Sequence, residues 1–111
     1  MTFSIILPTL NEKGHILDLI KEISNIFQNK NITFEIIVVD DSSSDGTPEI
    51  VNNYKKNKNF INLISRLNLK RNLADSINDG IKKANYENII WMDADFQHPP
   101  QYLENFIEYS Q

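Results

Sequence analysis

The sequence predicts an α/β fold built on a parallel sheet, because strand-like and helix-like segments alternate along the chain. Four short runs are apolar and rich in β-branched residues, without polar alternation: residues 3–7, 34–39, 60–64 and 89–92. Such runs are typical of strands buried on both faces of a sheet. The segments between them carry apolar residues at steps of three and four, as on one helical face. The order βαβαβαβα therefore predicts a Rossmann-like sheet of about four parallel strands with right-handed crossovers.

Each expected helix has an apolar stripe of its own. In chain order the stripes are Ile16, Leu19, Ile20, Ile23 and Phe27; then Ile50, Val51 and Tyr54; then Leu73, Ile77, Ile81 and Ala84; and finally Leu103, Phe106 and Ile107. The second helix is expected to begin with Thr47 as its N-cap and Pro48 in the first helical position. Trp91 lies within an apolar strand and is expected in the core.

Composition limits the class of protein. With 111 residues, 41% hydrophobic and 23% charged, residues 1–111 are expected to form a single soluble globular domain. A net charge of -4 argues against nucleic acid as a partner, and the lack of cysteine excludes disulfides and zinc–thiolate sites. No apolar run approaches the roughly 18 residues of a membrane span. The expected location is the cytoplasm, with any membrane contact peripheral.

Polar residues gather where the expected strands end, which is the edge where parallel α/β sheets bind ligands. The first strand is followed by Pro8 to Glu12, the second by Asp40 and Asp41, the third by Arg66, and the fourth by Asp93 and Asp95. Because paired acids follow two of the four strands, a binding site is expected at this edge.

Asp93 and Asp95 indicate either a metal site or a capped turn. On extended backbone, residues two apart point to the same side, roughly 7 Å apart. A hard divalent cation such as Mg²⁺ or Mn²⁺ would offset the repulsion between two such carboxylates. A turn before Pro99 and Pro100 explains the same pattern equally well.

The remaining polar residues also have two interpretations each. Asp40 and Asp41 could accept hydrogen bonds from a ribose or a base, or they could cap the next helix and stabilise the serine-rich turn. Arg66 could offset phosphate charge, or it could form a structural ion pair with Asp40 or Asp41. The sequence contains neither a dinucleotide-binding GxGxxG motif nor a P-loop.

Taken together, these segments resemble the N-terminal, nucleotide-binding part of the family 2 glycosyltransferases, which have the glycosyltransferase-A fold. The resemblance covers essentially the whole chain, in order and spacing. Its last segment looks most like the polyprenyl-phosphate (dolichol-phosphate type) mannosyl- and glucosyltransferases. The matching segments are residues 5–12, residues 37–41 with the turn 45–47, residues 65–66 and residues 92–100.

The resemblance implies a set of site residues. Pro8, Leu10 and Glu12 would line a nucleobase pocket, and Asp40 and Asp41 would hold base and ribose. Residues near the nucleotide-sugar would be Arg66, Ala94 and the two acids Asp93 and Asp95. The metal, Mg²⁺ or Mn²⁺, would be bound by Asp93, Asp95 and Gln97.

The implied reaction is metal-dependent, inverting transfer of a hexosyl group from a GDP- or UDP-sugar to an acceptor such as a polyprenyl phosphate. It would take place in the cytoplasm or at the cytoplasmic membrane face. Leu10 stands where the family often has tyrosine, and Asn72 where it usually has glycine.

The family's catalytic domain is about twice this length. The expectation is therefore a donor-binding half without acceptor-side catalytic residues, which a partner chain could complete, and a sheet with an exposed edge. The alternative is a non-catalytic nucleotide-sugar-binding or assembly subunit, or an inactive gene fragment.

Overall fold

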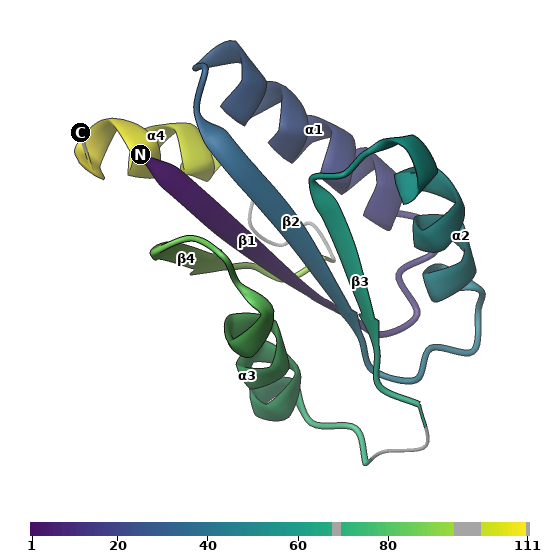
Figure 1. The fold of residues 1–111 in the computed structure, drawn as a ribbon. Helices are drawn as coiled ribbons and strands as arrows, with labels where there is room; N and C mark the ends of the chain where they lie inside the picture. Colours follow the sequence, from purple (N-terminus) through teal and green to yellow (C-terminus); the bar gives the residue numbers. More distant parts are fainter. Residues whose placement is uncertain (68–69, 95–100, 111) are drawn as a thin grey trace.

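The computed structural model describes residues 1–67, 70–94 and 101–110 and contains one parallel sheet with the strand order β3-β2-β1-β4 (Figure 1). The α/β fold predicted from the sequence is confirmed. The strands are β1 (Thr2–Thr9), β2 (Thr33–Asp40), β3 (Ile61–Ser65) and β4 (Asn88–Trp91). The helices are α1 (Ile16–Asn29), α2 (Thr47–Tyr54), α3 (Leu73–Lys83) and α4 (Gln101–Ser110), with a short 3₁₀ turn η1 (Lys55–Asn57).

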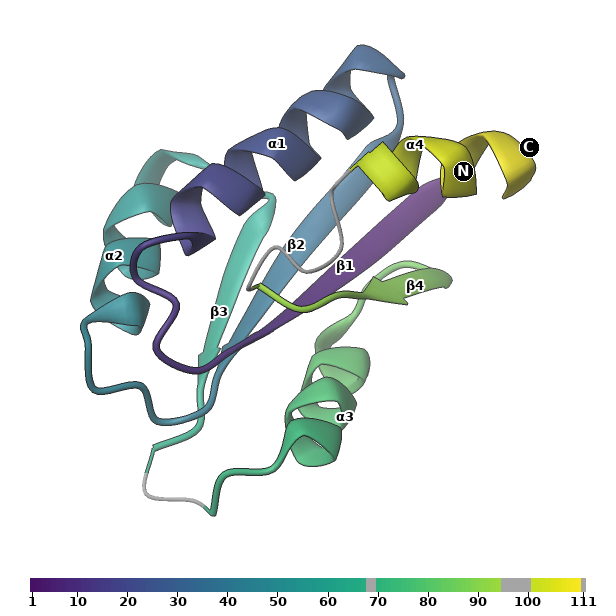
Figure 2. The ribbon, with the colours of Figure 1, turned by 180° about the vertical axis from the view of Figure 1, so that it is seen from behind.

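Helices cover both faces of the sheet, as the two opposite views show (Figures 1 and 2). One face of β1 and β2 packs with α1, α2 and α4 into the larger core cluster. On that face the rings of Phe3 and Phe34 each lie 5.3 Å from the ring of Phe27 on α1. The other face presents Ile6, Ile37 and Val39 and is covered by α3. Because helices cover both faces of β1 and β2, both strands have nearly continuous apolar sequences.

Gly80 brings α3 close to the sheet. A Cβ atom at this position would lie 2.6 Å from Cγ2 of Ile6, a buried residue on β1. Ile6 is β-branched and fully buried, so it has little room to move.

We expect Gly80→Ala to lower the free energy of unfolding by about 1–3 kcal/mol through overpacking, although alanine is the better helix former. Urea unfolding followed by circular dichroism measures the change. The matched control is Gly14→Ala, because no described atom lies within 4 Å of a Cβ at Gly14. Equal stability of the two variants would contradict the close packing.

Trp91 is the main error of the sequence-based fold prediction. Its side chain is 47% exposed, and Ile89 on the same strand is 40% exposed. Trp91 pairs in register with Ile6, so it faces the same side of the sheet as α3. Helix α3 packs chiefly on β1 and β2, however, and leaves this side of β4 open. β4 is therefore an edge strand with one exposed apolar face, in line with the exposed edge expected from the sequence.

The start of α2 also differs from the prediction. Gly46, with φ of 95°, is the N-cap, and Thr47 is already helical. The Asp45 carboxylate accepts a hydrogen bond from the Thr47 backbone N–H at 3.0 Å. This hydrogen bond takes the place of the one that the side chain of an N-cap residue usually accepts. Thr47 as N-cap is thus wrong by one residue, and its hydroxyl is left for another contact, described below.

None of the helices in the described part of the chain has the length and apolarity that a bilayer crossing requires.

Candidate functional site

A cavity of about 260 Å³ opens at the carboxyl ends of the strands. It is the place where the sequence predicted a site, because β1, β2 and β4 end there and α3 begins there. The structure brings six of the predicted site residues together in its lining: Pro8, Leu10, Glu12, Asp41, Asp93 and Ala94. The lining also includes five residues that were not predicted: Thr9, Arg71, Asn72, Leu73 and Ser76.

Asp41 joins the end of β2 to the start of α3. It is only 6% exposed, and its Oδ2 accepts a hydrogen bond of 2.8 Å from the backbone N–H of Asn72. Asn72 is the N-cap of α3, and its own side chain accepts from the backbone of Asp75 at 3.1 Å. Asp41 therefore lines the cavity and also fixes the helix that forms one wall.

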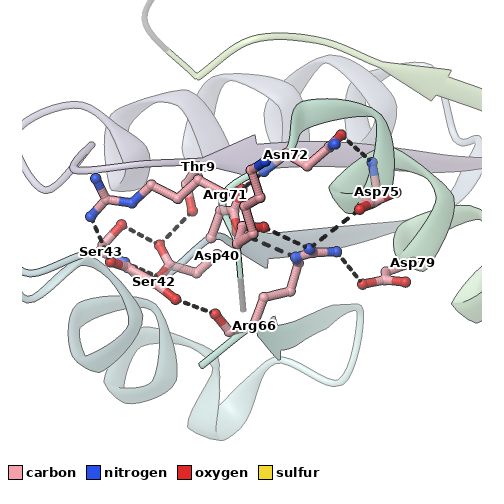
Figure 3. A network of polar contacts seen from close by, with 11 residues as sticks. Thr9, Asp40, Ser42, Ser43, Arg66, Arg71, Asn72, Asp75 and Asp79 are labelled. Carbon is pink, nitrogen blue, oxygen red and sulfur yellow. Dashed lines mark hydrogen bonds and ion pairs between the residues drawn. The ribbon is translucent and has the colours of Figure 1, made fainter. Parts of the chain in front are cut away.

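Arg66 is 6% exposed and does not line the cavity. Figure 3 shows its side chain directed toward Asp75 and Asp79 of α3. Its Nε donates to Asp41 Oδ1 at 3.3 Å, and its Nη1 donates to Asp79 Oδ2 at 2.8 Å. Burial opposes the charge, but the carboxylates of Asp79 and Asp41 raise the pKa of Arg66 above its ordinary value. Of the two sequence interpretations of Arg66, the geometry matches the structural ion pair, with Asp41 rather than Asp40.

Asp40 is fully buried and does not line the cavity. Its Oδ1 accepts from the hydroxyls of Thr9 at 2.8 Å and Ser43 at 2.6 Å, and its Oδ2 accepts from the Ser43 backbone at 2.9 Å (Figure 3). The two neighbouring acids thus differ in position: Asp41 faces the cavity, and Asp40 holds the serine-rich turn.

Side chains of the loop after β2 and of the first residue of α2 hold the loop after β1. The backbone N–H groups of Asn11, Glu12 and Lys13 donate in turn to Ser43 Oγ at 2.8 Å, Thr47 Oγ1 at 3.0 Å and Asp45 Oδ2 at 3.1 Å. We call these three hydrogen bonds the loop clasp. Asn11 adopts a positive φ of 56°, and its side chain accepts from the Ser44 backbone in return. The clasp sets where Leu10 and Glu12 stand at the cavity.

The carboxylate of Asp45 takes part in the clasp. Its slight burial would raise the pKa, but hydrogen bonds from the Thr47 hydroxyl and from the Lys13 and Thr47 backbones lower the pKa of Asp45 below its ordinary value. The group therefore stays ionised at neutral pH and contributes stability there. That contribution is lost as the pH falls through the lowered pKa.

Arg71 and Ser76 line the cavity but were not predicted from the sequence. Arg71 donates to the backbone oxygen of Ser42 at 3.2 Å and is the only arginine among the described residues of the lining. Ser76 lies one helical turn after the cap Asn72, so the four-residue step was a usable signal. The residues predicted to form the site were those that follow strands, and residues at the start of a helix were not included.

Asp93, two residues after the end of β4, places a carboxylate on the cavity, and Ala94 also lines it. Asp95 and Gln97, the other predicted metal ligands, lie outside the described residues. Within the described ranges, no three His, Cys, Asp or Glu side chains are grouped closely enough to hold a metal ion by themselves. Mg²⁺ or Mn²⁺ bound through one or two carboxylates, water and substrate phosphates does not need such a group. The described part of the lining offers carboxylate oxygens from Glu12, Asp41 and Asp93, and such ligands fit that kind of binding.

Comparisons with a family model and with curated proteins indicate the same class of protein. The family model described as "Glycosyl transferase family 2" matches residues 4–111. The dolichol-phosphate mannosyltransferase of Pyrococcus furiosus is 36% identical over 108 residues, which is 97% of this chain and 30% of that protein. The chain thus spans about a third of the length of the curated relatives it matches.

Solved structures share the fold. The mannosyltransferase PcManGT from Pyrobaculum calidifontis, solved with GDP-Man and Mn²⁺, superimposes with a TM-score of 0.73 at 27% identity, covering 84% of this chain and 27% of that one. TarS from S. aureus, solved with UDP, gives a TM-score of 0.70 at 30% identity, covering 98% of this chain and 32% of that one.

Proposed function

The chain belongs to glycosyl transferase family 2, and on that premise we propose that it supplies the donor-binding part of an enzyme that transfers a hexosyl group from a GDP- or UDP-sugar to an acceptor. One observation carries the proposal: the cavity at the carboxyl edge of the sheet is lined by Asp41, Glu12 and Asp93, which come from three different strand ends. The similar structures bind GDP-Man with Mn²⁺ and UDP.

We assign different residues of the cavity lining to the base and to the diphosphate of the donor. Pro8 and Leu10 provide apolar contact for a nucleobase, and the carboxylate of Asp41, which also accepts from Arg66, can accept a hydrogen bond from a base or ribose. Asp40 and Arg66 do not line the cavity; in this proposal they support it from behind.

A divalent cation, Mg²⁺ or Mn²⁺, would bind at Asp93 together with Asp95 and Gln97. When bound, it would neutralise the diphosphate leaving group as the bond to the sugar breaks. The protein's own contribution is to hold Asp93 at the end of β4, facing the same cavity as Asp41.

For the acceptor we propose a polyprenyl phosphate, since the Pyrococcus furiosus relative is a dolichol-phosphate mannosyltransferase. A lipid phosphate is already anionic near neutral pH, so its attack requires no strong general base. Attack in line with the leaving diphosphate would invert the anomeric carbon. A lipid acceptor would also bring the protein to the cytoplasmic face of a membrane.

Isothermal titration tests donor binding directly. We expect GDP- or UDP-sugars to bind the wild-type chain in the presence of Mn²⁺, with affinity lowered at least about tenfold in Asp93→Ala/Asp95→Ala, because a metal ligand is removed. The matched control is Glu22→Ala/Glu87→Ala, which removes the same charge from exposed positions outside the cavity lining. Failure of the wild-type chain to bind either nucleotide-sugar with Mn²⁺ would overturn the proposed function.

A further inference from the structure

Ser76 is a buried hydroxyl on the cavity wall. Its side chain is 1% exposed, and Oγ has no hydrogen-bond partner among the residues that the structure describes. It nevertheless lines the cavity. By contrast, the buried helical Ser24 donates to the backbone oxygen of Ile20 at 2.7 Å. Because buried polar groups in proteins are nearly always paired, Ser76 points to a partner that enters the cavity.

The position of Ser76 follows from the packing of α3. Ser76 and Gly80 are one turn apart, and Gly80 lies against Ile6 on β1. Pro8, two residues beyond Ile6 on the same side of β1, lines the cavity beside Ser76. The hydroxyl therefore belongs to the inner wall, where α3 meets the end of β1.

The same wall carries Asp41, whose two oxygens are held by Arg66 and by the Asn72 backbone. An ionised carboxylate disfavours a phosphate group in its neighbourhood. The apolar side chains of Leu73, Leu10 and Pro8 also belong to the lining. Its cationic side chain, Arg71, donates to the backbone oxygen of Ser42. A flat, neutral group with both N–H and carbonyl functions fits this wall better than a charged one.

Building on the proposed function, we propose that Ser76 is a specificity-determining residue that donates a hydrogen bond to the nucleobase of the donor. The acceptor on the base would be a carbonyl oxygen, as in uracil and guanine, next to a base N–H that donates to Asp41. Together the hydroxyl and the carboxylate present one donor and one acceptor to the edge of the base.

Ser76→Ala gives the proposal a distinctive signature. Loss of the hydrogen bond would leave the base carbonyl unpaired in the cavity and weaken nucleotide binding by about tenfold. The protein without nucleotide should be at least as stable as the wild type, because the substitution removes an unpaired buried hydroxyl and introduces the best helix former. A purely structural role would instead lower stability.

The experiment titrates UDP and GDP, with Mn²⁺, into wild type, Ser76→Ala and Ser76→Cys, and measures thermal unfolding of each without nucleotide. Cysteine keeps a side chain of similar size but is a weak donor, so its affinity should also fall. Ser24→Ala is the matched control and should bind the nucleotide as wild type does. Wild-type affinity in both Ser76 variants would overturn the role of Ser76 and leave the proposed function standing. Absence of binding to the wild type would overturn both.

Discussion

Replacing Asp41 with alanine is expected to lower the free energy of unfolding by about 3–5 kcal/mol, because it removes one of the two carboxylates, Asp41 and Asp79, that hydrogen-bond to the buried Arg66. The loss also removes the acceptor for the Asn72 backbone N–H, so the start of α3 is no longer fixed to β2. Since α3 forms one wall of the cavity, nucleotide binding should fall as well, by at least about tenfold.

A double-mutant cycle separates the ion pair from the other contacts of Asp41. Urea unfolding of Asp41→Ala, Arg66→Met and the double variant measures the coupling between the two side chains. We expect the double variant to be more stable than the sum of the single effects, because it no longer buries the arginine that has lost its hydrogen bond to Asp41. Strict additivity would mean that the contact of 3.3 Å between Arg66 Nε and Asp41 Oδ1 carries no energy.

Replacing Phe27 with alanine should have an equally large effect on stability and none on the site. Phe27 is fully buried, and its ring lies between those of Phe3 and Phe34. Truncating a buried phenylalanine typically costs about 3–5 kcal/mol through lost burial and the cavity that remains. Phe27 lies near the C-terminal end of α1, whereas the cavity lies where α1 is about to begin.

The comparison with Phe27→Leu controls for volume, since leucine fills more of the space and should retain most of the stability. Well below the melting temperature, both Phe27 variants should bind nucleotide with the affinity of the wild type. Weak binding by folded Phe27→Ala would show that the aromatic cluster and the cavity are coupled, contrary to their separation in the structure.

The sequence predicted the fold well because the fold depends on local patterns. Strands β1 and β2 are buried on both faces, and each appears in the sequence as a nearly continuous apolar run. The prediction was wrong for Trp91, because the burial of β4 depends on whether a helix covers it, and periodicity carries no such information. The N-cap of α2 was missed by one residue because Asp45, rather than Thr47, accepts from the helix backbone.

The site was predictable only in part, for a related reason. Residues such as Asp41 and Asp93 could be identified from their place after a strand, since parallel topology brings strand ends to one edge. Ser76 lies on α3 and Arg71 lies just before its N-cap Asn72. The four-residue step from Asn72 to Ser76 becomes informative only when the packing of α3 on β1 and β2 is known. Asp40 and Asp41 also occupy different positions, and the sequence motif alone does not show which of the two side chains faces the cavity.

The loop clasp has a consequence for the thermodynamics of ligand binding. It joins residues 11–13 to residues 43–47 through contacts that exist before any ligand arrives. The conformational entropy of ordering these two loops is therefore lost when the chain folds, rather than when a nucleotide binds. A ligand that enters a preorganised site keeps more of its interaction energy as affinity. Loosening the clasp would thus weaken binding without removing a single contact to the ligand.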